Sequence, residues 1–172
     1  MCGRPVIFNE IREHADAVLC TWWLGSEAGN AICNVLWGEY NPSAKLPMTF
    51  PAHVGQIPIY YQNKSTGRPT ALKQTYKASY IDASTEPAYP FGYGLSYTDF
   101  GYSDLKLLPG KAAGVHTEVS VKVTNTGKCA GEEVVQLYVQ DKVASVTRPI
   151  KELKGFRKIH LNVGESKTVA FQ

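Results

Sequence analysis

The most informative absences in this sequence concern net charge, long apolar runs and paired cysteines. The 172 residues carry 18 Lys and Arg against 15 Asp and Glu, and no four basic residues follow one another, so nothing favours a nucleic-acid partner. The longest apolar stretch, residues 17–24, is far shorter than the roughly 20 residues of a membrane helix. Glu10, Arg12, Glu13 and Asp16 interrupt any signal-peptide core. We therefore expect no nucleic-acid partner and no membrane partner.

Cysteine is scarce, and its spacing suits neither a metal site nor a disulfide framework. Cys2, Cys20, Cys33 and Cys129 show no C-x-x-C spacing and have no histidine nearby at zinc-ligand spacing. Cys20 and Cys33 lie within apolar segments, where a free cysteine usually behaves as a small core residue. We expect buried thiols, with a single bridge left as the alternative. We expect no cofactor and no metal.

What the sequence does contain is typical of a globular α/β region followed by an all-β region. Apolar residues make up 44% and charged residues 19% of the chain. The run 17–24 predicts a strand buried on both faces, as in a parallel sheet. Apolar residues at helical spacing predict a helix over 28–36, and Gly38 is expected to end it in the left-handed conformation. Glu27 lies between them and either faces a cleft or is a first-turn carboxylate favoured by the helix dipole.

The middle of the chain shows no sustained periodicity. Residues 41–51 contain three prolines and predict an extended crossing segment. Residues 52–88 combine Tyr60, Tyr61, Tyr76 and Tyr80 with amides and Arg68. Rings that stack on sugar faces and forked donors that grip hydroxyls are typical of a sugar site. The alternative is a wrapping linker whose tyrosines simply pack.

Residues 89–100 are the stretch around which the chain is organised. Large rings alternate here with Pro90, Gly92 and Gly94, and the glycines allow backbone conformations that a Cβ would forbid. This pattern indicates a corner at which aromatic area is buried between two bodies. An ordinary aromatic-rich loop is the alternative.

From Tyr102 onward the apolar pattern changes to period two. Strands are predicted at 118–124, 133–140, 153–161 and 167–171, with turns at 125–127 and 162–165. Val135, Leu137 and Val139 are expected on one face of their strand, and Phe156 is expected in the core. Five or six short strands predict a β-sandwich, which we expect to be incomplete because a full sandwich has about seven.

Taken together, these stretches resemble the C-terminal part of glycoside hydrolase family 3, the β-glucosidase and β-xylosidase family, and most closely its bacterial periplasmic β-glucosidase type. The resemblance is collinear over essentially the whole chain, and residues 89–100 are its most diagnostic part. The other stretches that carry it are 3–5, 15–17, 22–27, 35–38, 41–43, 45–51, 54–61, 66–69, 123–127, 135–139, 148–149 and 154–156. The sequence departs from the family pattern at Ala28, Asn34 and Ala44, which puts two turns under potential strain.

The resemblance implies a domain organisation. Residues 1–50 would be the C-terminal part of the family's α/β sandwich domain, residues 51–95 a connector, and residues 96–172 a fibronectin type III-like domain that lacks its final strands. The fold class is therefore α/β plus all-β. An N-terminal (β/α)8 barrel with the nucleophilic Asp, and the acid/base Glu, would lie upstream of this chain.

The expected function follows from the chemistry that these residues can and cannot supply. Retaining glycosidases need two carboxyl groups about 5–5.5 Å apart, and neither of the family's catalytic motifs is present. Glu27, Glu39, Asp82 and Glu86, the carboxylates nearest the presumed cleft, are better explained as caps, turn residues or solvated groups. We therefore expect part of a β-glycosidase that hydrolyses terminal β-linked sugars, without catalytic residues of its own and inactive alone.

The expected partners are a β-linked oligosaccharide or glycoside, the absent barrel, and a second copy of the chain through open strand edges. Tyr60, Tyr61 and Arg68 are the predicted substrate-binding residues. The resemblance implies a periplasmic or secreted protein. The alternative functions are a non-catalytic carbohydrate- or protein-binding module and a chain that complements a separately encoded barrel.

Overall fold

Strands outnumber helices in the computed structural model, which describes residues 1–65, 67–68, 78–108 and 117–172. These residues form two units. Unit 1 comprises Met1–Gly29, Leu46–Tyr93 and Val139–Glu152, and unit 2 comprises Asn30–Lys45, Gly94–Tyr138 and Leu153–Gln172. Neither unit is continuous in sequence, because the chain passes between them several times.

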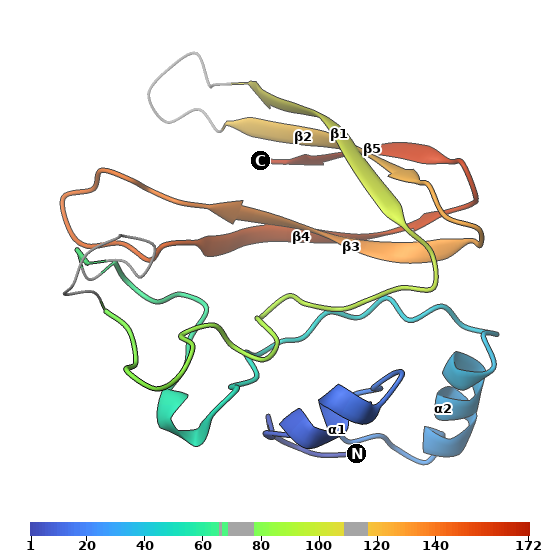
Figure 1. Cartoon of the computed structure of the whole chain (residues 1–172). Helices are drawn as coiled ribbons and strands as arrows, with labels where there is room; N and C mark the ends of the chain where they lie inside the picture. Colours follow the sequence, from blue (N-terminus) through green and yellow to red (C-terminus); the bar gives the residue numbers. More distant parts are fainter. Residues whose placement is uncertain (66, 69–77, 109–116) are drawn as a thin grey trace. The chain divides into compact units, whose positions relative to one another are not determined.

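The strands of unit 2 form two open sheets, coloured yellow to red in Figure 1. The first sheet has the order β1-β2-β5 and is antiparallel, and the second pairs β3 with β4. The strands are β1 (Phe100–Leu108), β2 (Glu118–Asn125), β3 (Gly131–Val139), β4 (Glu152–Leu161) and β5 (Ser166–Phe171). Figure 1 shows the two sheets stacked as layers, which confirms the predicted β-sandwich.

Side chains from both sheets form the core of unit 2. Val123 of β2, Val135 of β3, Leu161 of β4 and Val169 of β5 are almost fully buried against one another. Phe100, Val121, Ile159 and Phe171 pack around them. The alternation of β2 and β5 directs these apolar side chains inward, as the period-two pattern predicted.

The turn at 162–165 forms as expected, but the prediction that Phe156 lies in the core is wrong. Gly164 has φ +75°, and the Glu165 amide donates to the Asn162 carbonyl at 3.0 Å. Phe156 is 67% exposed. Since neighbouring side chains of a strand point to opposite faces, Phe156 cannot share the inward face of Ile159 and Leu161.

The predicted helix over 28–36 is confirmed as α2 (Ala28–Leu36), and Gly38 follows it with φ +79°. Two further short helices, α1 (Asn9–His14) and the 3-10 helix η1 (Val54–Gln56), belong to unit 1. Neither Ala28 nor Ala44 has a positive φ, so these two of the three departures from the family pattern place no alanine in a left-handed turn.

The predicted strand over 17–24 is wrong, because no strand is assigned there. Trp22 has φ +52°, a left-handed conformation that a regular strand excludes. Val18 and Trp23 are 49% and 82% exposed. A parallel strand takes all its ladder hydrogen bonds from neighbouring strands, and the described residues supply no such neighbour to this run.

Phe50 and Gln56 hold unit 1 together in place of a sheet. Both are buried, and Phe50 forms an isolated antiparallel bridge with Tyr89. The Gln56 amide group donates to the carbonyls of Ser84 and Glu86 at 3.0 and 3.1 Å. Its side-chain oxygen accepts from the Ala52 backbone amide at 2.7 Å. One side chain therefore ties together segments that are about thirty residues apart.

Candidate functional site

An aromatic cluster fixes the first half of the stretch 89–100 within unit 1. Phe8 stacks on Tyr89 with ring centroids 5.9 Å apart and meets Phe50 edge-on at 6.2 Å. Trp22 lies against Phe50 at 5.7 Å, and Tyr89 contacts Tyr93 at 5.0 Å. Edge-to-face and offset contacts of this kind stabilise packing beyond the area they bury. The rings 89–93 thus have structural partners.

Tyr61 and Tyr60 are neighbours in sequence but differ in environment. The Tyr61 ring stacks on Phe91 with centroids 4.1 Å apart and an interplanar angle of 12°. The Tyr61 hydroxyl accepts from the Gln62 side chain at 2.9 Å. Tyr60, by contrast, is 69% exposed. Tyr60 therefore presents a ring to solvent, whereas one face of Tyr61 is covered by Phe91.

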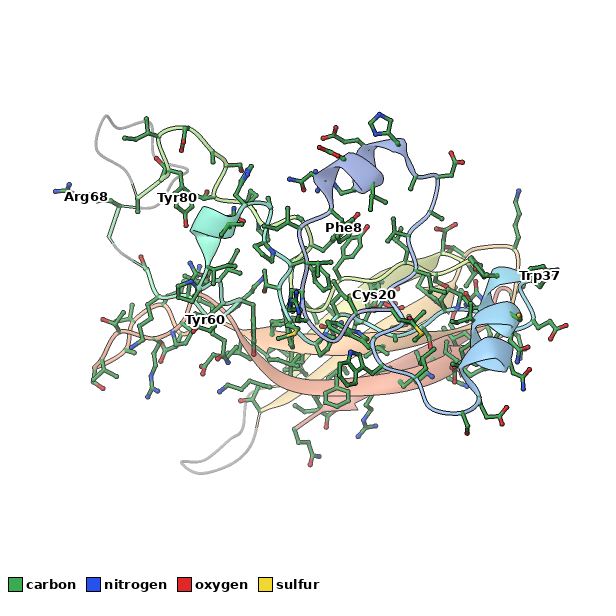
Figure 2. All side chains as sticks on the ribbon, turned by 90° about the horizontal axis from the view of Figure 1, so that it is seen from below. Phe8, Cys20, Trp37, Tyr60, Arg68 and Tyr80 are labelled. Carbon is green, nitrogen blue, oxygen red and sulfur yellow. The ribbon has the colours of Figure 1, made fainter. Side chains whose placement is uncertain are left out.

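Arg68 lies apart from this pair. Its side chain is exposed and points away from the ribbon, at a distance from Tyr60 that Figure 2 makes plain. The Arg68 carbonyl accepts from the Ala78 amide at 2.9 Å, and the hydroxyl of nearby Tyr80 donates to the Gly55 carbonyl at 3.2 Å. The structure thus brings Tyr60 and Tyr61 together but not Arg68. Tyr76 lies outside the described residues.

The carboxylates that the sequence placed near a cleft are all exposed. Glu27 directly precedes α2 rather than lying in its first turn, and Glu86 is a turn residue whose amide donates to the Ser84 hydroxyl. Glu39 and Asp82 are likewise exposed. A general acid needs an apolar environment that raises its pKa, and an exposed position does not provide one.

The buried carboxylate of unit 2 belongs to Glu133, a residue that sequence reasoning did not single out. The Lys45 ammonium group lies 3.1 Å from the Glu133 carboxylate, and the Tyr102 hydroxyl donates to it at 2.9 Å. Burial and the neighbouring Glu133 charge raise the pKa of Tyr102, which keeps its hydroxyl a donor. The alternation of side chains along a strand could have identified it, because Glu133 lies two residues before Val135 and therefore points to the same, inward face of β3.

Glu132, the preceding residue of β3, binds a separate set of partners on the opposite face. It lies 2.6 Å from the Lys158 ammonium group and accepts from the Tyr40 hydroxyl at 2.7 Å. Hydrogen bonds from Lys158 and Tyr40 lower the pKa of Glu132, and the same carboxylate raises the pKa of Lys158. A lowered pKa is the opposite of what a general acid requires at neutral pH.

The first half of the proline-rich stretch, residues 41–45, is anchored within unit 2 by its polar side chains. The Asn41 oxygen accepts from the Tyr97 amide at 2.8 Å, and the Asn41 amide group donates to the Ser96 hydroxyl at 2.9 Å. Lys45 also donates to the Gly94 carbonyl at 2.9 Å. A Cβ on Gly131 would lie 2.0 Å from the Asn41 side chain, so this close approach requires glycine. These hydrogen bonds hold residues 41–45 of the predicted extended segment in place within unit 2.

Within the described residues, no three His, Cys, Asp or Glu side chains lie close enough together to hold a metal ion. In the same part of the chain, every helix is too short or too polar to cross a membrane.

Comparison with known proteins gives a consistent picture along the chain. The glycosyl hydrolase family 3 C-terminal domain matches residues 1–97, and the fibronectin type III-like domain matches residues 133–172. A periplasmic beta-glucosidase of Salmonella typhimurium is 52% identical over 99% of this chain and 23% of its own length. A beta-xylosidase of Formosa agariphila is 48% identical over 99% of the chain and 23% of its own length.

A solved structure agrees. The beta-glucosidase of Listeria innocua, crystallised with glucose, superposes with a TM-score of 0.92 at 44% identity, covering 98% of this chain and 24% of that one. The chain therefore spans about a quarter of the length of these relatives. Since the family model accounts for more than half of its residues, the chain belongs to glycosyl hydrolase family 3, as C-terminal domain sequence followed by a fibronectin type III-like β-sandwich.

Proposed function

We propose that this chain acts as the C-terminal part of a β-glycosidase that removes terminal β-linked sugars, and that its 172 residues alone cleave no glycoside. The observation that carries the proposal is a match at 52% identity along 99% of the chain to a periplasmic beta-glucosidase of which only 23% is covered. The catalytic nucleophile and acid/base then belong to the remainder of such an enzyme.

The carboxylates of the described residues support the second half of the proposal. A retaining site needs two carboxyl groups about 5–5.5 Å apart that face one substrate. Glu132 and Glu133 are neighbours, but they point to opposite faces of β3, and each is paired with a lysine. Their role is to hold the sandwich and the segment 40–45 together.

The substrate contact proposed for this chain involves Tyr60, Tyr61 and Arg68. Tyr60 offers an exposed ring on which an apolar sugar face can stack, and Tyr61 supports that position through its contact with Phe91. Arg68 contributes a separate exposed donor that can bind hydroxyl groups. We place these residues at the outer part of a sugar site, where the leaving portion of a glycoside lies.

The remaining proposals concern organisation and location. We propose domain boundaries at residues 50 and 95, with an α/β portion before, a connector between and the type III-like domain after. The partner of the chain is a (β/α)8 barrel, and a second copy of the chain is a further partner. Because a relative that matches along 99% of the chain is named a periplasmic enzyme, we propose a periplasmic or secreted location.

The first experiment compares the chain alone with a chimera. In the chimera, residues 1–172 replace the matched segment of the Salmonella typhimurium enzyme. We expect the chain alone to release no aryl group from an aryl β-glucoside or an aryl β-xyloside, and the chimera to release it. Turnover by the chain alone contradicts the proposal. Binding of a glycan by the chain alone, without any turnover by the folded chimera, favours the non-catalytic binding module instead.

Substitutions in the chimera test the substrate contact. Tyr60→Ala and Arg68→Ala should each lower kcat/KM by about tenfold, the equivalent of about 1.4 kcal/mol of lost transition-state binding. Tyr60→Phe should keep most of the activity, since it keeps the ring. Arg157→Ala removes an exposed arginine of β4 and is the matched control, which should change neither constant. If Tyr60→Ala and Arg68→Ala behave like the control, the assignment is wrong.

A further inference from the structure

Residues 63–65 form a pattern that the proposed glycosidase function does not use. Asn63-Lys64-Ser65 is an Asn-x-Ser sequence without proline in the middle, the acceptor pattern for N-linked glycosylation in exposed segments of secreted proteins. All three residues are exposed, and they belong to unit 1. Because so short a pattern also arises by chance, the conformation of this segment decides whether Asn63 can accept a glycan.

Backbone contacts hold the segment in an extended conformation. Lys64 forms an isolated antiparallel bridge with Pro149. The Asn63 carbonyl accepts from the Ile150 amide at 3.0 Å. In an extended backbone, side chains two positions apart point to the same side. The Asn63 carboxamide and the Ser65 hydroxyl therefore lie on one side of the chain, and the Lys64 side chain lies on the other.

The Ser65 hydroxyl can assist Asn63 because the two side chains share this side. It accepts a hydrogen bond from the Gly67 amide at 3.4 Å. A hydroxyl group has one O–H donor in addition to its acceptor lone pairs, so this contact leaves the O–H available for the carboxamide oxygen of Asn63. A hydrogen bond of that kind holds the carboxamide in place while its nitrogen reacts.

A second Asn-x-Ser pattern in the chain shows the opposite features. Asn41-Pro42-Ser43 has proline in the middle, which the acceptor pattern excludes. Ser43 is 5% exposed. The Asn41 side chain is engaged in hydrogen bonds with Ser96 and Tyr97 within unit 2. Asn41 is therefore a matched asparagine that should stay unmodified.

We propose that Asn63 accepts an N-linked glycan when the chain enters a compartment that contains an oligosaccharyltransferase. The proposal rests on the secreted location proposed above and not on catalysis. The side-chain nitrogen of Asn63 attacks the anomeric carbon of an oligosaccharide carried by a lipid diphosphate. A carbon–nitrogen bond forms, the bond from that carbon to the diphosphate oxygen breaks, and the lipid diphosphate leaves with the electron pair. The nitrogen loses one proton to solvent, so the step needs no oxidant or reductant.

The test directs the whole chain into a eukaryotic secretory pathway with a cleavable signal peptide. We expect the intact mass of the secreted chain to increase by one glycan, and peptide N-glycosidase to remove this mass. Because that enzyme leaves aspartate where the glycan was attached, peptide mapping should place the modification at position 63 and find Asn41 unmodified. A secreted chain without a glycan, or one with its glycan on Asn41, overturns the proposal.

Substitutions and a second measurement on folded protein separate the acceptor pattern from folding. Asn63→Gln and Ser65→Ala should abolish glycosylation, whereas Ser65→Thr and Lys64→Ala should retain it. All three positions are exposed, so the melting temperatures should stay close to that of the parent chain. The folded chain, produced without secretion, should also accept a lipid-linked oligosaccharide at Asn63 from a purified oligosaccharyltransferase. Absence of transfer there, or a glycan that persists in Ser65→Ala, contradicts the proposal. These readouts involve no turnover, so they are independent of the result with the chimera.

Discussion

The two units of this chain differ in how far they bury their apolar side chains. In unit 2, apolar side chains from four strands bury one another, and Leu161 is fully enclosed. In the described part of unit 1, Phe50 and the neighbouring Pro51 are buried, while Val18, Leu19 and Trp23 are largely exposed. Both units carry strongly apolar stretches. Apolar sequence therefore yields a core only where its hydrogen-bonding partners are also present.

The physical reason lies in the two kinds of sheet. Antiparallel strands can pair with the next strand along the chain, as β1 pairs with β2. A buried parallel strand depends on strands supplied by distant parts of a fold. Residues 17–24 have the composition of such a strand without the neighbours. Unit 1 relies instead on ring contacts around Phe50 and on the hydrogen bonds of Gln56.

The largest difference in stability is expected when one large apolar side chain is removed from each unit in turn. Leu161→Ala should lower the free energy of unfolding by about 4 kcal/mol, since it leaves a cavity in the closed core. Trp23→Ala should cost less than about 1 kcal/mol, because the ring is 82% exposed. Urea unfolding followed by hydrogen exchange at β2 and at residues 17–24 measures both changes. Equal losses would contradict the difference between the units.

A second, smaller effect concerns the two lysine–carboxylate pairs on opposite faces of β3. Lys45→Met leaves the buried Glu133 carboxylate without its cation, and it should destabilise the chain by about 3 kcal/mol. Adding Glu133→Gln should recover part of the loss, since no unpaired charge then remains buried. A double-mutant cycle in urea checks the coupling. A simple sum of the two single effects would show that the pair contributes no interaction of its own.

The smallest effect is expected from the exposed pair. The side chains of Lys158 and Glu132 are 46% and 30% exposed, so Lys158→Met should cost less than about 1 kcal/mol at neutral pH. The pKa of Glu132 is lowered in the folded state, so its contribution is present above the pKa of an unfolded Glu and disappears as the pH falls through the folded value.

The contribution of Lys158 to stability depends on pH in the opposite sense. Its pKa is raised, so its contribution is present below the pKa of an unfolded Lys and is lost as the pH rises through the folded value. Unfolding curves of the parent chain and of Lys158→Met, measured from acid to alkaline pH, should therefore converge at both extremes and differ most between them. A difference that is independent of pH would assign the effect to packing rather than to charge.

Much of this architecture could be predicted from local patterns. The alternation of 118–124 and 167–171 predicted β2 and β5, and the apolar spacing of 28–36 predicted α2 together with its stop at Gly38. Phe156 was assigned to the core because apolar residues recur around it, although strand parity places it outside. Parity could also have marked Glu133 as inward-facing, although the sequence analysis did not use it, whereas its partner Lys45 lies 88 positions earlier and could not be predicted from β3 alone.

The sequence by itself determined the family, the strands β2 to β5 of the sandwich, the helix α2 and the turns at Gly38 and Gly164, because each depends on residues only a few positions apart. Tertiary structure alone decided that Lys45 neutralises Glu133, that Phe91 covers Tyr61 and that residues 17–24 form no strand. These outcomes depend on which distant segments become neighbours. That choice is made by burial and hydrogen bonding across the whole fold, and local periodicity does not encode it.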